Sequence, residues 1–229
     1  VVAEQAMLNA DYVTELVRTQ GLEDRIGVFG VHSYFDYPVE TYREIVDLVQ
    51  SSPYAGASVW LSEYGDLDQT GEKEWFVAWA STRRLLDALE AGFNGAMVWD
   101  AYDNYHDHNE FWTIYGLLRT GLGVFTPKKR YYAAKQVYRY VLPGFQRIQV
   151  ESDSDHIRML GFSDPARATV MLVGMNLSSS NRYINVALKG IDENLLAGRV
   201  GYYRTTESED CVKVGEKNVT SSDFPYAGP

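Results

Sequence analysis

The residues best suited to chemistry form a short run in which a hydrophobic segment ends in an acid. In Val59-Trp-Leu-Ser-Glu63-Tyr-Gly65, a strand-like pattern delivers the carboxylate of Glu63 and then breaks at Gly65. When such strands lie parallel in a barrel, side chains just past their ends converge on one edge, where active sites form. A glutamate there could attack an anomeric carbon and form a covalent glycosyl intermediate. An acidic turn residue that caps the next helix would give the same local pattern, so this run alone does not decide between the two.

The neighbouring strand ends carry residues that could complete a site. Tyr34 follows the strand before Glu63, and its hydroxyl could hold a carboxylate ionised and oriented by hydrogen bonding. Trp99 ends the strand after Glu63, where its ring could form the floor of a sugar site. Each residue alone is more commonly a packing residue, so the combination carries the interpretation. The residues that we expect to contact substrate are His32, Trp99, Asp100, Tyr102 and Asn104.

A metal site is the competing interpretation of the loop after Trp99. His106-Asp107-His108 and Glu110 place two imidazoles and two carboxylates within five residues, and the His-x-His spacing can bind zinc. The same loop also carries Asp103, Asn104 and Tyr105, as a substrate-contacting or simply solvated loop would. We favour the polar loop, and we expect no metal and no cofactor.

Apolar periodicity predicts the elements that position these residues. Three short buried strands alternate with helices, which is typical of a parallel sheet with helical crossovers. A sheet of only three strands is too small to be covered well by helices on both faces. We therefore expect this region to be the last part of a larger α/β structure. The expected helices are 2–20, 39–50, 72–91 and 129–141, and the expected strands are 26–31, 57–61 and 95–99.

The pattern changes after Gly144 to short segments rich in β-forming residues and separated by turn residues, which is typical of an antiparallel sandwich. We place the boundary near residues 143–146. This divides the chain into a partial barrel over 1–143 and a β-sandwich over 144–229. The expected strands of the second part are 147–150, 156–162, 168–176, 183–188 and 198–203.

Composition excludes some classes of partner. The chain has 229 residues, 45% of them hydrophobic, and its formal charge of -10 argues against nucleic acid and anionic membrane surfaces, which carry the same sign. Seventeen Tyr, nine Phe and five Trp mildly favour a carbohydrate ligand, because aromatic rings stack on sugar faces. Cys211 is the only cysteine, so no disulfide is possible within the chain. We expect no membrane span, because no run of 18 apolar residues occurs.

In order and spacing, these runs resemble strands six, seven and eight of the barrel in glycoside hydrolase clan A. The segments downstream resemble glycoside hydrolase family 30 and its relatives, in which a joining helix leads from the barrel to a side sandwich. The resemblance implies a (β/α)8 barrel with a fused β-sandwich, acting on β-glycosidic bonds with retention. By position, Glu63 matches the nucleophile, Tyr34 its hydrogen-bonding neighbour and Trp99 the strand-eight aromatic, with His32 a lesser candidate. The matching runs are His32–Tyr34, Trp60–Gly65, Gly92–Trp99, Lys129–Phe145, Met171–Asn176 and Tyr202–Thr206, followed by the tail around Pro225.

One departure from the family pattern concerns the acid/base residue. The family places an Asn-Glu pair after strand four, whereas Asn109-Glu110 follows the third strand here. We therefore expect this chain to be the C-terminal part of a longer enzyme that is secreted, periplasmic or on the cell surface, and to be inactive alone. The expected substrate is a β-linked poly- or oligosaccharide, with the glycan and the oligomeric state left open. A non-catalytic carbohydrate-binding fragment and, less favoured, a metal-dependent hydrolase remain as alternatives.

Overall fold

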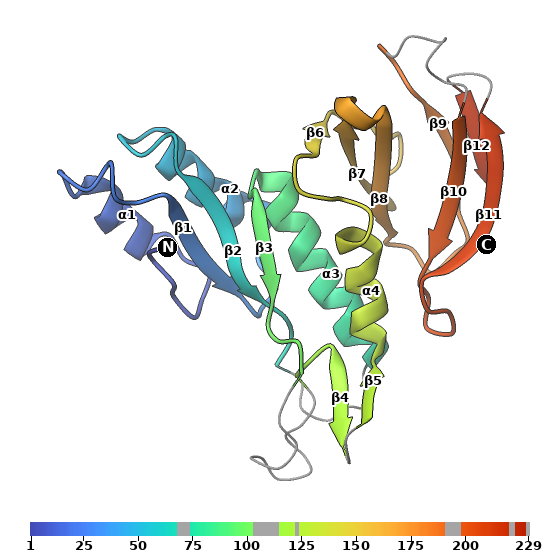
Figure 1. Ribbon diagram of the computed structural model, residues 1–229, viewed down its shortest axis with the longest axis horizontal. Coiled ribbons are helices and arrows are strands. Elements are labelled where there is room, and N and C mark those ends of the chain that lie inside the picture. The colour runs from blue at the N-terminus through green and yellow to red at the C-terminus, as the bar shows by residue number, and fades with distance from the viewer. Residues whose placement is uncertain (68–73, 103–114, 122–123, 191–197, 220–222, 228–229) are drawn as a thin grey trace. The chain divides into compact units, whose positions relative to one another are not determined.

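The computed structural model describes residues 1–67, 74–102, 115–121, 124–190, 198–219 and 223–227. The chain forms two compact units, Val1–Tyr131 and Tyr132–Pro229, and helix α4 (Lys129–Tyr138) crosses from one to the other. The first unit contains parallel strands and helices, and the second contains antiparallel strands (Figure 1).

The first unit is built on a three-stranded parallel sheet in the order β1-β2-β3. Three helices alternate with these strands, as the periodicity predicted, and α2 contacts both α3 and β2 (Figure 1). Helix α2 follows Pro38, as expected, because proline fixes a backbone angle suited to a helix start. The elements are α1 (Asp11–Arg18), β1 (Val28–Ser33), α2 (Val39–Gln50), β2 (Ser58–Tyr64), α3 (Glu74–Ala91) and β3 (Gly95–Val98).

The core of this unit lies between the sheet and its helices. Side chains with almost no exposed surface come from both layers, and each fully buried aliphatic or aromatic side chain stabilises the fold by roughly 1.5–3 kcal/mol. Its largest members are Phe29, Val31, Tyr42, Ile45, Val49, Val59, Leu61, Tyr64, Leu85 and Leu86.

The helix expected over residues 2–20 is wrong in its first half. Helix α1 covers only Asp11–Arg18, and residues 1–5 run along the outer edge of β1. The Val2 N–H donates to the Val28 carbonyl at 3.0 Å, and the Val2 carbonyl accepts from the Gly30 N–H at 2.8 Å. The open edge of a sheet offers unpaired backbone groups, and pairing with them outweighs the local helical pattern.

The sequence did not indicate the hairpin that leads into α4. Strands β4 (Leu118–Gly121) and β5 (Val124–Pro127) pair antiparallel, directly before the start of that helix. The side chains of β5 are exposed, so its sequence shows no buried face for a pattern to reveal.

Over its described residues, the second unit holds three antiparallel sheets. Their orders are β6-β7-β8, β9-β12 and β10-β11. All five strands that the sequence predicted for this part are present, whereas β11 was missed because Lys, Glu and Asn interrupt its apolar residues. The elements are β6 (Gln146–Ile148), β7 (Ile157–Asp164), the 3-10 helix η1 (Pro165–Arg167), β8 (Thr169–Asn176), β9 (Tyr183–Ala187), β10 (Gly198–Arg204), β11 (Val212–Val219) and β12 (Asp223–Ala227).

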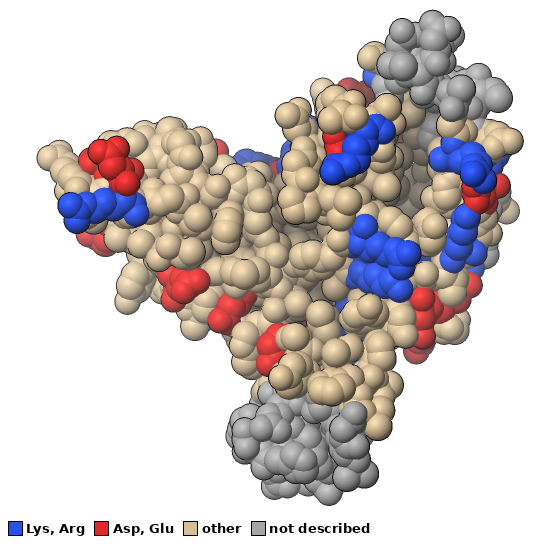
Figure 2. All heavy atoms as spheres, in the orientation of Figure 1, with Lys and Arg blue, Asp and Glu red and all other residues tan. Residues whose placement is uncertain are grey.

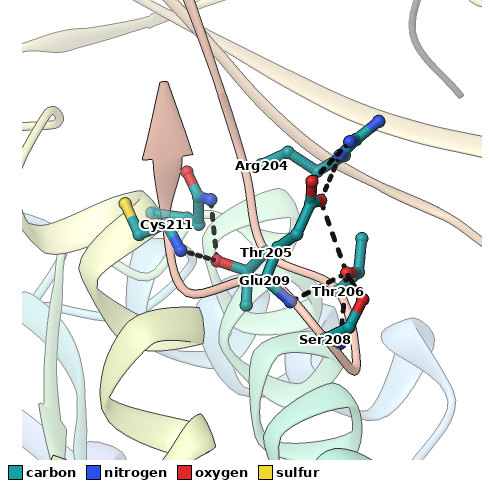
Figure 3. Close-up of polar contacts among 7 residues, drawn as sticks. Arg204, Thr205, Thr206, Ser208, Glu209 and Cys211 are labelled. Atoms are coloured by element: carbon teal, nitrogen blue, oxygen red, sulfur yellow. Dashed lines mark hydrogen bonds and ion pairs between the residues drawn. The ribbon is translucent and has the colours of Figure 1, made fainter. Parts of the chain in front are cut away.

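A polar cluster fixes the connection between β10 and β11 (Figure 3). The Thr205 hydroxyl accepts a hydrogen bond from Gln136 Nε2 of α4 at 2.8 Å and another from the Cys211 N–H at 3.1 Å. The Arg204 guanidinium forms two hydrogen bonds with the Glu209 carboxylate, at 2.5 and 2.7 Å. These contacts hold the connection closed and join it to α4.

The mixed class of an α/β part followed by an antiparallel β part is confirmed. Among the described residues, no helix is both long enough and apolar enough to cross a lipid bilayer. On the face shown in Figure 2, uncharged residues form most of the surface, and acidic and basic side chains occur in small separate groups.

Candidate active site

A register shift near the ends of β1 and β2 brings the candidate residues to one face of the sheet. Val31 pairs with Leu61, but the next residue, His32, pairs with Glu63, so Ser62 is an extra residue in β2. Without that shift, Leu61 and Glu63 would lie on the same face, because side chains alternate along a strand. The bulge instead places Glu63 on the face of His32, opposite to buried Leu61. Bulges of this kind commonly redirect a side chain next to an active site.

Glu63 lies in a cluster of polar groups from two strands. The Tyr34 hydroxyl donates a short hydrogen bond to Glu63 Oε2. His32 Nδ1 lies 3.4 Å from the same oxygen. The Glu63 side chain is 35% exposed, and that of His32 is 13% exposed, so the carboxylate can be reached by a ligand while its partner is enclosed. The structure thus brings together all three residues that the sequence placed at these two strand ends.

The aromatic residue of the third strand end packs against this cluster. The Trp99 ring meets the Tyr34 ring edge to face, with centroids 5.8 Å apart and planes at 87°. Its other neighbour is Tyr115, whose ring centroid lies 5.3 Å away. The backbone N–H of Trp99 donates to the Tyr64 carbonyl at 2.8 Å, and the peptide bond between Trp99 and Asp100 is cis. Tyr115 was missed because no strand or helix pattern precedes it in the sequence.

The protonation of Tyr34 follows from its surroundings. Burial raises the pKa of the Tyr34 hydroxyl above its ordinary value, and the hydrogen bond to Glu63 raises it further. The negative charges of Glu63 and Asp100 act in the same direction. Tyr34 therefore keeps its proton and remains a hydrogen-bond donor to the carboxylate across the neutral and moderately alkaline range.

The other expected substrate contacts lie further along the chain. Asp100 is half-buried, and its backbone carbonyl accepts from the Leu117 N–H at 2.9 Å. Tyr102 is 53% exposed and packs edge to face on Phe125 of the hairpin. Asn104 lies outside the described residues.

Close packing of the backbone holds the three strand ends together at Gly65. A Cβ atom added to Gly65 would come within 2.6 Å of the Trp99 carbonyl oxygen, so a larger residue would push the third strand end away. The Gly65 N–H also donates to the Ser33 carbonyl at 3.3 Å. Glycine at this position therefore allows the backbones of all three strand ends to approach one another.

A buried arginine supports the same strand ends from α3, and the sequence analysis missed it. Arg84 Nη1 donates to the Gly65 carbonyl at 2.6 Å and to Asp66 Oδ2 at 2.8 Å. Arg84 Nη2 lies 3.1 Å from Asp36 Oδ1. The available signal was an arginine directly before the apolar residues Leu85 and Leu86 in the expected helix 72–91.

The competing metal hypothesis concerns residues outside the described part of the chain. His106, Asp107, His108 and Glu110 all belong to the segment 103–114. Within the described ranges, no group of three or more His, Cys, Asp or Glu side chains is arranged to hold a metal ion.

Comparison with solved structures defines the class of fold. The chain superimposes on a glycoside hydrolase family 30 endoxylanase from Clostridium papyrosolvens C71 with a TM-score of 0.78 and 17% identity, over 100% of this chain and 53% of that one. For Xyn30A, a family 30 subfamily 8 xylanase from Clostridium acetobutylicum, the TM-score is 0.71 at 12% identity, over 98% of this chain and 51% of the other. For the catalytic domain of xylanase C from Talaromyces cellulolyticus, it is 0.55 at 15% identity, over 85% and 50%.

These structures share the fold of this chain, and the chain spans about half of their length. The resemblance to glycoside hydrolase family 30 that the motifs indicated is therefore confirmed at the level of the fold. No known protein-family profile matches the sequence, and no curated protein matches it either.

Proposed function

We propose that this chain carries the nucleophile side of the active site of a retaining β-glycoside hydrolase, with Glu63 as the nucleophile. The observation that carries the proposal is the hydrogen bond from the Tyr34 hydroxyl to Glu63 Oε2, at the ends of adjacent parallel strands. A donor held against one oxygen of a carboxylate orients it and stabilises its negative charge. An acidic turn residue would have no need of such a partner on the neighbouring strand.

The geometry assigns separate roles to the two carboxylate oxygens. Tyr34 and His32 both lie against Oε2, so Oε1 is the oxygen proposed to attack. In the first step, Oε1 forms a bond to the anomeric carbon while the bond from that carbon to the glycosidic oxygen breaks. The electron pair of the broken bond leaves with the glycosidic oxygen, which takes up a proton from an acid. In the second step, water attacks the anomeric carbon and gives one proton to the conjugate base of that acid, and Glu63 leaves as a carboxylate.

The acid of this mechanism requires a second carboxyl about 5–5.5 Å from the nucleophile. We propose that another part of the enzyme, not represented in this chain, supplies this second carboxyl. We also propose that β1, β2 and β3 of this chain are strands six to eight of a (β/α)8 barrel. The parallel order of these strands and the coverage of half of the xylanase structures support this arrangement. We propose residues 144–229 as the side β-sandwich of the same enzyme. On this view the chain does not turn over natural substrates alone.

The substrate proposed is a β-linked poly- or oligosaccharide. Trp99 would form the aromatic floor of the sugar site, with Asp100, Tyr102 and Asn104 as further contacts. Polymeric glycans of this kind occur outside the cytoplasm, so we propose a secreted, periplasmic or cell-surface setting for the full-length parent.

A covalent label tests the nucleophile without needing the acid. The probe is 2,4-dinitrophenyl 2-deoxy-2-fluoro-β-xylobioside, whose dinitrophenolate leaves without protonation. Attack by Glu63 should leave a fluoroxylobiosyl ester, which intact-protein mass spectrometry detects and peptide mapping locates. The Glu63→Gln variant should fold normally and remain unlabelled. Labelling at another residue, or equal labelling of the Gln variant, would overturn the assignment.

The carbohydrate-binding alternative predicts a different result from the same proteins. A non-catalytic fragment would bind xylo-oligosaccharides equally well with Glu63 or with Gln at that position, and neither protein would be labelled. Calorimetric titration with xylohexaose alongside the labelling experiment separates the two functions.

A further inference from the structure

Arg84 is a buried cation in the middle of α3. Its side chain is 6% exposed, and a buried guanidinium is costly unless it is paired and hydrogen-bonded. Its partners are the Asp66 carboxylate, the Asp36 carboxylate and the Gly65 carbonyl. A planar guanidinium can serve several oxygens at once because its donors point outward in a fixed fork.

These partners belong to the two strand exits that carry the candidate site. Asp36 lies two residues after Tyr34, at the exit of β1, and Gly65 lies two residues after Glu63, at the exit of β2. One guanidinium therefore bridges the segments that hold the donor and the acceptor of the Tyr34–Glu63 hydrogen bond.

The bridge acts at a point where small displacements matter. Gly65 already touches the Trp99 carbonyl so closely that no Cβ would fit, so its backbone position sets that of the third strand end as well. Functional side chains must be held within about 0.5 Å of their working geometry by supporting contacts. A shift of either exit would change the separation of the Tyr34 hydroxyl and the Glu63 carboxylate.

We infer that Arg84 is a positioning residue that sets the Tyr34–Glu63 pair by tying the exits of β1 and β2 to α3. The inference rests on the proposed function only in so far as that pair is catalytic. Within the described residues, Arg84 forms no hydrogen bond or ion pair with Tyr34 or Glu63, so its effect is expected to pass through Asp36, Gly65 and Asp66.

The test compares Arg84→Met and Arg84→Lys with a control on the same helix. Arg83→Met removes the same charge from a residue whose guanidinium lies 3.8 Å from Asp87 of the same helix and not against a strand exit. Two readouts are followed. The first is the alkaline titration of Tyr34, measured by NMR on protein with 13Cζ-labelled tyrosine and assigned by the signal lost in Tyr34→Phe. The second is the labelling rate with the dinitrophenyl fluoroxylobioside.

In Arg84→Met, we expect Tyr34 to ionise at lower pH than in the wild type and labelling to slow by at least tenfold. In Arg84→Lys, the retained positive charge should restore the Tyr34 titration and the labelling rate in part. The recovery should be incomplete because one ammonium group cannot replace the several donors of the planar guanidinium. Arg83→Met should match the wild type in both. Wild-type behaviour of folded Arg84→Met would overturn the inference, as would equal changes in the Arg83 control.

A variant at the exposed end of the bridge guards against failure of Arg84→Met to fold. The Asp36 side chain is 49% exposed, so Asp36→Asn should fold and loosen the β1 exit alone. The Tyr34 titration should then move to lower pH, by less than in Arg84→Met. An unchanged Tyr34 titration in this variant and in Arg84→Lys would also refute the positioning role. If the wild type is not labelled but the Arg84 variants shift the Tyr34 titration, the proposed function fails and the positioning role stands. If the wild type and all Arg84 variants are labelled equally, the proposed function stands and the positioning role of Arg84 fails.

Discussion

Removing the hydroxyl of Tyr34 is the sharpest test of the electrostatics of the site. Tyr34→Phe deletes the donor to Glu63 Oε2 and keeps the ring that packs edge to face on Trp99. The substitution therefore isolates the hydrogen bond from the packing around it. We expect the variant to fold and to react with the fluoroxylobioside more slowly than the wild type.

The size of the effect follows from the charge and the exposure of the acceptor. A hydrogen bond to a charged group contributes about 1.5–3 kcal/mol, and about 1.4 kcal/mol corresponds to a tenfold change in rate. Because the Glu63 side chain is 35% exposed, water can partly replace the lost donor. The expected loss of stabilisation therefore lies at the lower end of the range of about 1.5–3 kcal/mol. This corresponds to a labelling rate reduced by about 10- to 30-fold.

The assay follows the release of dinitrophenolate by absorbance and the ester by mass. The matched control is Tyr37→Phe, the same chemical change three residues away, because the buried Tyr37 hydroxyl has no hydrogen-bond partner among the described residues. The control should react at the wild-type rate. A wild-type rate for Tyr34→Phe, or an equal loss in Tyr37→Phe, would refute the role given to the Tyr34 hydroxyl.

Three further predictions concern stability. Gly65→Ala should cost about 1–3 kcal/mol, because its Cβ would meet the Trp99 carbonyl at 2.6 Å, whereas Gly56→Ala, with nothing within 4 Å, should change chemical denaturation little. Burial raises the pKa of Tyr42 to about 12, so its contribution is complete below pH 10 and should fall by about 1.4 kcal/mol per pH unit from 10 to 12. Denaturation at several pH values should show this slope reduced in Tyr42→Phe, and an unchanged slope would contradict the assignment. Burial, with Arg130 nearby, lowers the pKa of Lys128 to about 8, so folding becomes more favourable as pH rises from 8 to 10.5. Lys128→Met should therefore raise the melting temperature at pH 7 and give no gain at pH 10.5, and a gain of equal size at both values would refute this.

The sequence by itself determined the order of the parallel strands and helices of the first unit, although not its β4–β5 hairpin or the first residues of its first helix. Apolar periodicity located α2, and the segments around α3 and α4, because a helix buries one stripe and a short central strand is apolar throughout. The same logic placed Glu63, Tyr34 and Trp99 at strand ends. The boundary near residues 143–146 stays a prediction, although the chain divides into compact units at residues 131 and 132.

Tertiary structure decided what local patterns cannot encode. The five N-terminal residues pair with the edge of β1 instead of continuing a helix, because a free sheet edge offers backbone partners that no local sequence reveals. Exposed β5 and polar β11 show too weak an alternation to be predicted.

The face on which Glu63 lies was also decided in three dimensions. Strict alternation would place Glu63 with buried Leu61, and only the bulge at Ser62 turns it toward His32 and Tyr34. Arg84 then fixes the two strand exits from a helix some twenty residues further along the chain. Sequence pattern specified which residues stand at the strand ends, because periodicity is a local property. The register and the supporting contacts arise between distant segments, so the shape of the site came from the tertiary structure alone.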